Sequence, residues 1–284
     1  MVLSVEEAPR RCPQCALPML LLRLHTHGGS KVEVDHCAQC RLVWFDTLES
    51  VQLSGLGWLE LLREMGRAAG HEVGHEAGRP APRPHRLSCP VCARPLKSVH
   101  NRSRWGRFAM QECALGHGHL HSDAGLLAER GLVRPLLPPE RASLRAQARV
   151  LHCLSCGAAA DGRGEICAAC ATPLLVVDLP RLGHALRQRG ADEQPLPPAE
   201  GVPLRWPCHA CGQTLDPTRA SACPQCGAGL LAPELAGLAP LLNAAEPELR
   251  AAANHPPRAR PVRPARRTWR ETQLARLWRW MRSN

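Results

Sequence analysis

The sequence predicts small zinc-stabilised α+β modules: tandem zinc ribbons, which are short β hairpins with attached helices, followed by a C-terminal amphipathic helix. All but one of the 15 cysteines fall in Cys-x-x-Cys pairs. Aromatic residues make up only 3% of the 284 residues, too few to build conventional cores that offset chain entropy. Residues 1–11 have no apolar leader and no stretch of 18 apolar residues follows. We therefore expect a cytoplasmic protein whose reduced thiols bind metal.

The cysteines group by adjacency into four metal sites. A two-residue gap lets both thiolates of one turn, here called a knuckle, reach the same ion, and two knuckles complete a tetrahedral zinc site. This grouping leaves three cysteines for the second site, which a histidine completes. The expected ligands of four Zn²⁺ ions are Cys12, Cys15, Cys37 and Cys40; Cys89, Cys92, Cys113 and His117; Cys153, Cys156, Cys167 and Cys170; and Cys208, Cys211, Cys223 and Cys226.

The histidine of the second site is chosen from three candidates. His117, His119 and His121 follow Cys113 closely, and which of them completes the site stays open at this point. We expect His117, because it is nearest to Cys113 and its neighbouring glycines permit a tight bend. With His117 as the sixteenth ligand, all 15 cysteines belong to a site with four ligands.

Other uses of paired cysteines explain the pattern less well. A thioredoxin-like redox site needs a single pair in a βαβ unit, and a disulfide framework needs an oxidising compartment. Iron–sulfur clusters use the same ligands and stay an alternative to zinc.

The first module is expected over residues 1–65. Strands at 19–26 and 31–36 flank a Gly-Gly turn that suits a hairpin, and a third short strand covers 42–46. A capping-box pattern places the start of a helix near Thr47, although glycines weaken its middle.

This module resembles the transcription factor IIB-type zinc ribbon that is widespread in bacterial proteins. The resemblance rests on Cys-Pro-x-Cys at 12–15, Val-Asp-x-Cys-x-x-Cys at 34–40 and Val-Trp-Phe-Asp at 43–46. Arg41 follows the second knuckle, where that family favours Gly. The order of motifs over about residues 11–180 also resembles a bacterial multi-zinc-ribbon family. That resemblance implies an architecture and no particular activity.

Composition shifts and helix-cap signals set the other boundaries. In the module that follows the first linker, Ser122 and Asp123 cap a helix that Gly131 closes, and Pro138 begins another running to about Val150. The expected divisions are a linker at 66–87, a zinc module with helices at 88–150, a ribbon plus helix at 151–190, a linker at 191–204, a ribbon plus short helix at 205–243, and a basic tail with an amphipathic helix at 244–284.

Positive charge is concentrated in the tail. The formal net charge is +11, but zinc-bound thiolates reduce it to about +4 for the loaded protein. Residues 250–284 hold ten Arg and one Glu, so the ribbons are weakly acidic once zinc is counted. Nucleic-acid binding, which depends on neutralising phosphates, is therefore expected only through the tail.

The tail also carries an apolar stripe at helical spacing. Leu274, Leu277, Trp278 and Met281 share one face. A basic amphipathic helix of this kind docks on its own protein, on a partner protein, on nucleic acid or, as a peripheral contact, on a membrane. The sequence leaves these four alternatives open.

One motif suggests catalysis. His71, Glu72 and His75 form an H-E-x-x-H sequence, the zinc-binding helix of metallopeptidases. The third ligand of the extended motif would fall on Ala81, which cannot bind metal, and glycines interrupt the segment. We therefore expect no enzyme, with a zinc hydrolase as a minor alternative.

The expected function is that of a zinc-binding multi-ribbon scaffold that recognises a protein or nucleic-acid partner, without catalysis and without a small-molecule substrate. The alternative is a transcription-related zinc-finger protein that binds nucleic acid. Composition and spacing identify neither the partner nor the oligomeric state.

Overall fold

The computed structural model describes residues 9–71, 86–103, 106–160, 164–187 and 203–254. It has a mixed α+β fold in which the described strands form one six-stranded antiparallel sheet and three two-stranded sheets. The chain divides into two units, residues 1–254 and 255–284. The expected C-terminal amphipathic helix belongs to the second unit and lies outside the described residues, as do Glu72 and His75 of the H-E-x-x-H motif.

The three strands expected in the first module are confirmed. Strands β1 (Leu20–His25) and β2 (Lys31–Cys37) form an antiparallel hairpin, and β3 (Leu42–Asp46) pairs with β2. Alternate residues of β1 and β2, such as Leu22 and Val34, are buried. One face of the hairpin therefore belongs to the core.

The helix expected from Thr47 is split in two. A short helix α1 (Glu49–Gln52) precedes α2 (Gly55–His71), which continues six residues past the expected end of the first module. Half of the expected capping box is present, because the backbone N–H of Asp46 donates to Oε2 of Glu49 at 2.7 Å. Leu48, with φ of 70°, turns the chain between β3 and α1.

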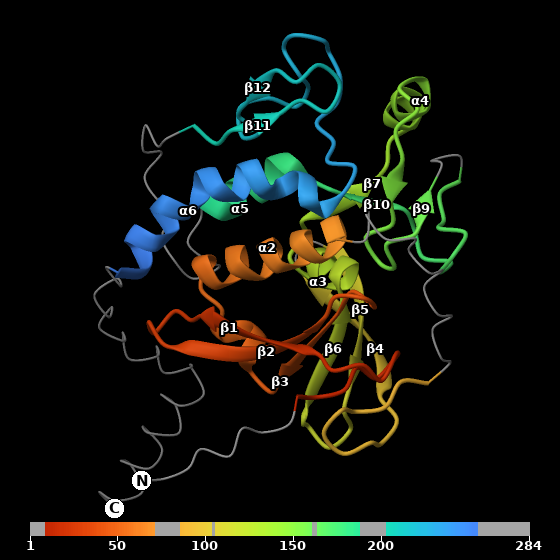
Figure 1. The fold of residues 1–284 in the computed structure, drawn as a ribbon, viewed down its shortest axis with the longest axis vertical. Helices are drawn as coiled ribbons and strands as arrows, with labels where there is room; N and C mark the ends of the chain where they lie inside the picture. The colour runs from red at the N-terminus through yellow and green to blue at the C-terminus, as the bar shows by residue number, and fades with distance from the viewer. Residues whose placement is uncertain (1–8, 72–85, 104–105, 161–163, 188–202, 255–284) are drawn as a thin grey trace, which may run out of the picture. The chain divides into compact units, whose positions relative to one another are not determined.

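A strand that we did not expect joins the first two modules. The described chain contains β4 (Lys97–Ser103), β5 (Gly106–Glu112) and β6 (Gly118–Ser122). Strand β6 pairs with β3, which gives the sheet order β1-β2-β3-β6-β5-β4 (Figure 1). The sequence indicates only a ligand-bearing turn in the Gly-His-Gly-His segment, which lacks the β-branched residues that signal a strand.

The helices after this sheet begin where the cap signals place them. The hydroxyl of Ser122 accepts a hydrogen bond from the backbone of Gly125 and caps α3 (Asp123–Glu129). Helix α4 (Pro138–Ala146) begins at its proline and ends four residues short of the expected Val150. Strands β7 (Val133–Pro135) and β10 (Leu175–Val177) pair, which connects the second module to the third.

The two C-terminal ribbons are small hairpins followed by helices. They contain β8 (Leu151–His152) with β9 (Ala159–Ala160), and β11 (Trp206–Pro207) with β12 (Thr214–Leu215). Their helical segments are α5 (Leu179–Arg187), the 3₁₀ turn η2 (Leu235–Leu238) and α6 (Ala239–Asn254). Helix α6 crosses the expected boundary at 243/244. Among the described helices, none has the length and hydrophobicity that crossing a bilayer requires.

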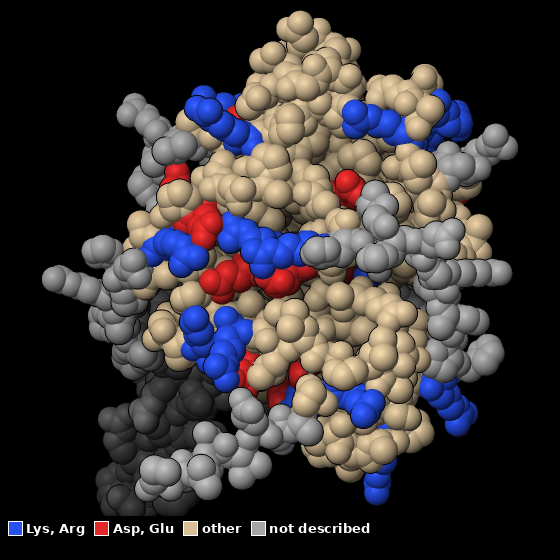
Figure 2. Space-filling model, in the orientation of Figure 1, with Lys and Arg blue, Asp and Glu red and all other residues tan. Residues whose placement is uncertain are grey.

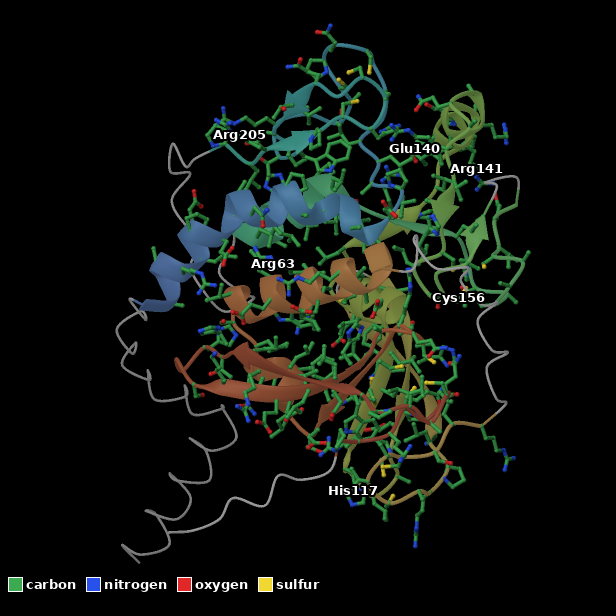
Figure 3. All side chains as sticks on the ribbon, viewed as in Figure 1. Arg63, His117, Glu140, Arg141, Cys156 and Arg205 are labelled. Carbon is green, nitrogen blue, oxygen red and sulfur yellow. The ribbon has the colours of Figure 1, made fainter. Side chains whose placement is uncertain are left out.

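A leucine-rich core holds these parts together. Helix α2 lies between the large sheet and α6 (Figure 1), and Leu59, Leu61 and Leu241 are fully buried. At the edge of this contact, Arg63 of α2 donates to Glu246 of α6 at 2.7 Å (Figure 3). Hydrogen bonds from Arg63 and then Arg250 lower the pKa of Glu246. Helices α2 and α6 therefore pack together despite their separation in sequence.

Two glycines of α2 permit close backbone approach. A Cβ atom on Gly57 would lie 2.1 Å from the carbonyl oxygen of His25 in β1. One on Gly66 would lie 3.1 Å from the carbonyl oxygen of Leu235 in η2. These two glycines let α2 contact the sheet on one side and η2 on the other.

We predict that Gly57→Ala destabilises the protein by about 3 kcal/mol, because the added methyl group overlaps backbone that cannot move aside easily. The matched control is Gly28→Ala in the β1–β2 turn, where a Cβ meets no atom within 4 Å. That change should alter stability by less than about 0.5 kcal/mol. Denaturant unfolding at fixed free zinc measures both, and equal effects of the two substitutions would contradict the packing described here.

Candidate metal centres

The knuckles repeat one backbone arrangement. In the knuckle at Cys89, the N–H of Ala93 donates to the carbonyl oxygen of Cys89 at 2.9 Å. The N–H of Cys89 donates to the carbonyl oxygen of Arg94 at 2.8 Å. The same pair of bonds occurs in the knuckles that begin at Cys12, Cys153, Cys167, Cys208 and Cys223. A turn of this kind places two thiols on the same side of the chain.

The residue after each knuckle has a positive φ. This holds for Gly157, Gly212 and Gly227 and also for non-glycine residues. The four non-glycine residues in this position are Ala16, Arg41, Ala93 and Ala171, with φ between 52° and 61°. The left-handed turn is therefore imposed by the knuckle and not by glycine alone.

Arg41 shows what a non-glycine residue contributes in this position. It adopts φ of 52° where the resembling family favours Gly, and it is buried. Its guanidinium donates to the carbonyl oxygen of Cys153 at 3.4 Å. The second knuckle of the first site is thus linked to the backbone of the third site.

The structure brings together the same sixteen side chains that the spacing groups. In each of the four clusters, all four candidate ligand atoms lie within 4.8 Å of one another. Six sulfur pairs are 3.7–3.8 Å apart: Cys15–Cys37, Cys92–Cys113, Cys153–Cys170, Cys156–Cys167, Cys208–Cys226 and Cys211–Cys223.

These separations fit a tetrahedral metal and do not fit disulfides. A tetrahedron with Zn–S bonds of about 2.3 Å has sulfur–sulfur edges of about 3.8 Å. A disulfide bond would instead place two sulfur atoms about 2 Å apart. The described residues are therefore geometrically consistent with four zinc-binding modules.

In the second cluster, geometry separates the three candidate histidines. Nδ1 of His117, in the β5–β6 turn (Figure 3), lies 3.5 Å from Sγ of Cys113 and 3.8 Å from Sγ of Cys89. A sulfur–nitrogen edge of about 3.6 Å is expected around tetrahedral zinc. His119 instead stacks on Phe45 with ring centroids 5.5 Å apart, and His121 packs edge-on to the same ring.

In each cluster the pKa of one thiol is lowered, whereas the pKa of at least one neighbouring thiol is raised. In the first site, hydrogen bonds from Cys37 and then Cys40 lower the pKa of Cys12 to about 2. In the third site, Cys153 and then Cys156 lower the pKa of Cys170, and the hydroxyl of Thr172, 2.9 Å from its Sγ, contributes to the same shift. Backbone N–H groups of Gln14, Val91 and Ala210 also donate to first-knuckle sulfurs at 3.4 Å.

The first two sites border one buried cluster. Its centre is Trp44 of β3, which is fully buried with Leu42 and Leu120 between the cysteines of both sites. The third site has its own small core around Leu174. In the fourth site Cys211 and Cys226 are exposed, whereas every cysteine of the other sites is buried or half-buried.

A charged network that the sequence did not reveal supports the first site. Nε1 of Trp44 donates to Asp46 at 2.8 Å. Arg10, just before the first knuckle, donates to both carboxylate oxygens of Asp46 at 2.8 Å and to Asp35 at 2.9 Å. Asp35 and Asp46 stand on neighbouring strands, so only the strand register brings them to one arginine.

Comparisons with known proteins add no further identification, since no protein family matches this chain and no curated protein or solved structure is significantly similar to it. The four clusters are therefore identified as candidate metal sites by their geometry, within a mixed α+β fold.

We predict that His117→Ala removes one metal ion of four, because it leaves the second cluster with three of its four ligand atoms. His119→Ala is the matched control. Because His119 packs on Phe45, this substitution should lower stability by about 1 kcal/mol while all four ions remain bound. Native mass spectrometry in the presence of a competing chelator counts the ions. Loss of an ion from His119→Ala and not from His117→Ala would overturn the ligand assignment.

A second prediction concerns the turn after the knuckles. Ala93→Gly should stabilise the zinc-loaded protein by about 1 kcal/mol, because Gly adopts a positive φ without strain. Gly212→Ala, at the equivalent position with open space around it, should destabilise by a similar amount. Denaturant unfolding measures both. Shifts of the same sign would show that the knuckle does not impose this conformation.

Proposed function

We propose that this protein is a zinc-binding scaffold that holds four Zn²⁺ ions and recognises a macromolecular partner. The observation that supports it most directly is the donor set, fifteen thiols and one imidazole in four clusters with tetrahedral spacing. Soft sulfur ligands with two-residue gaps favour zinc over calcium or magnesium, which require oxygen ligands. We also propose that the first module is a transcription factor IIB-type ribbon, supported by its hairpin, third strand and two knuckles.

The sites are proposed to be structural. Each cluster offers four protein ligands, whereas a catalytic zinc keeps one position for water or substrate. Each cluster also closes a hairpin whose own apolar core is small, so metal binding supplies folding free energy. The reduced thiols required by these sites support a cytoplasmic location.

A protein partner is favoured over nucleic acid for the ribbons. Figure 2 shows Lys and Arg interspersed with Asp and Glu on the viewed face, without a continuous basic surface. Several of the described basic side chains, including Arg10, Arg63 and Arg134, are paired with carboxylates. Phosphate binding needs cations that are not already paired. A second candidate, nucleic-acid binding, rests on residues 255–284, which hold nine Arg and one Glu.

Deletion of residues 255–284 tests the two candidates. This boundary retains helix α6 with its buried Leu249 and keeps Arg250, which pairs with Glu246. We predict that partner capture by the immobilised zinc-loaded protein survives both the deletion and nuclease treatment. The deletion should abolish any binding of nucleic acid, and before deletion that binding should weaken steeply with salt.

The readout is affinity capture at two salt concentrations, with and without nuclease, followed by identification of the bound protein. A variant in which the tail arginines are replaced by lysine is the control for charge alone. Tight, sequence-specific DNA binding by the protein without its tail would contradict the proposed scaffold and support a role in transcription.

A further inference from the structure

Strand β4 forms one edge of the large sheet. The sheet order places it beyond β5 (Figure 1), and all seven of its residues pair with β5 in one continuous register. That register has no bulge, and no proline interrupts the strand. A regular strand of this length at a sheet edge is a template on which another extended chain can pair.

The free hydrogen-bonding groups of β4 belong to alternate residues. Leu96, immediately before the strand, donates from its backbone N–H to the carbonyl oxygen of Leu87, on the side away from β5. Backbone groups of successive residues in a strand point to opposite sides. The N–H and C=O groups of Ser98, His100 and Arg102 therefore also point away from β5, and no described residue forms a backbone hydrogen bond with them there.

The opposite edge of the sheet, strand β1, is partly closed. The backbone N–H of His25 donates to Oε2 of Glu60 in α2 at 3.1 Å. The N–H of Ser54, just before the same helix, donates to the carbonyl oxygen of His25 at 3.0 Å. Helix α2 thus covers the end of β1. Within the described residues, no helix covers the edge of β4 in this way, so β4 is the more accessible edge.

The chain around β4 is a second concentration of positive charge. Residues 86–111 hold six Lys and Arg and no Asp or Glu. A zinc ion bound by three thiolates and one imidazole lowers this charge by only about one unit. Arg86, Arg94 and Lys97 are exposed, and none of their side chains pairs with a described residue, although Glu112 stands opposite Lys97 in the register. The edge therefore favours a partner that carries carboxylates.

The same strand borders a cleft. Ser98 and His100, whose backbone groups are free, line a cleft of about 750 Å³ together with Arg86. Its other walls combine apolar side chains such as Leu96 with neutral polar ones such as Thr172 of the third module, and no Asp or Glu lines it. Alternate side chains of a strand added to β4 would lie on this face, where the cleft can receive them.

We propose that the outer edge of β4 binds an extended, acidic segment of a partner protein as an additional strand. Main-chain hydrogen bonds to the alternate free residues hold the segment, and its carboxylates pair with the surrounding cations. A peptide supplies both donors and acceptors to this edge, whereas phosphate groups of nucleic acid only accept. The inference names a surface and a class of partner for the proposed scaffold, and it rests on that proposed function.

Amide hydrogen exchange of the full-length zinc-loaded protein, measured by nuclear magnetic resonance, tests this mode of binding. The probe is an acetylated and amidated heptapeptide of alternating valine and glutamate. Without it, the amides of Ser98, His100 and Arg102 should exchange quickly, whereas the intervening amides, which bond to β5, should be protected. With it, the three fast amides should exchange at least about tenfold more slowly. A peptide with lysine in place of glutamate should bind at least about tenfold more weakly.

His100→Pro removes the central free N–H and should weaken binding of the glutamate peptide at least about tenfold. Proline is tolerated at an edge position whose N–H faces solvent, so β4 should stay paired with β5. His100→Ala keeps the N–H and is the matched control, which should bind as the wild type does. Arg94→Gln combined with Lys97→Gln leaves the backbone unchanged and should weaken the glutamate peptide alone, by about threefold or more.

Protection of the three amides before peptide is added would overturn the proposal, because the edge would already be covered by this chain or by a second copy. Equal binding of the two peptides, or equal binding by His100→Pro and His100→Ala, would overturn it as well. Protection of the same amides by a single-stranded oligonucleotide and not by the glutamate peptide would assign the edge to nucleic acid instead. Affinity capture of a protein partner that His100→Pro leaves unchanged would retain the scaffold function and reject this surface.

Discussion

The structure depends on one geometric constraint: four ligand atoms must meet around each metal position. The sulfur–sulfur separations of 3.7–3.8 Å match the edges of a tetrahedron of thiolates around a zinc ion. Two knuckles must therefore lie close together at each metal position. Their approach closes the hairpins and orders the turns that follow the knuckles. The left-handed conformation of Ala93 and Arg41, unfavourable by itself, follows from the same constraint.

The modules nevertheless form one structure through contacts that the metal sites do not supply. Pairing of β3 with β6 merges the first two ribbons into a single sheet, with Trp44 buried between their sites. Arg41 connects the first site to the carbonyl oxygen of Cys153. Helix α2, packed between this sheet and α6, extends the core to the fourth ribbon. Buried leucine side chains supply most of the apolar core, which so few aromatic residues would not provide.

Local features could be predicted from the sequence, and long-range ones could not. The ligand groups follow from spacing within the chain, and the cap at Ser122 follows from neighbouring residues. Strand β6 was missed because its pairing partner, β3, lies more than 70 residues away. The role of Gly57 was misjudged for the same reason, since only the fold places His25 against it. His121 is a candidate ligand by spacing, and only the structure packs it against Phe45 instead.

X-ray absorption at the zinc edge of the fully loaded protein tests the central claim most directly, because it reports the ligand atoms and their distances together. Fifteen sulfur atoms and one nitrogen over four sites give an average first shell of 3.75 sulfur and 0.25 nitrogen ligands. The sulfur atoms should lie at about 2.3 Å from the metal. A shell dominated by oxygen or nitrogen, or a preparation in which iron and not zinc accompanies the protein, would contradict the account.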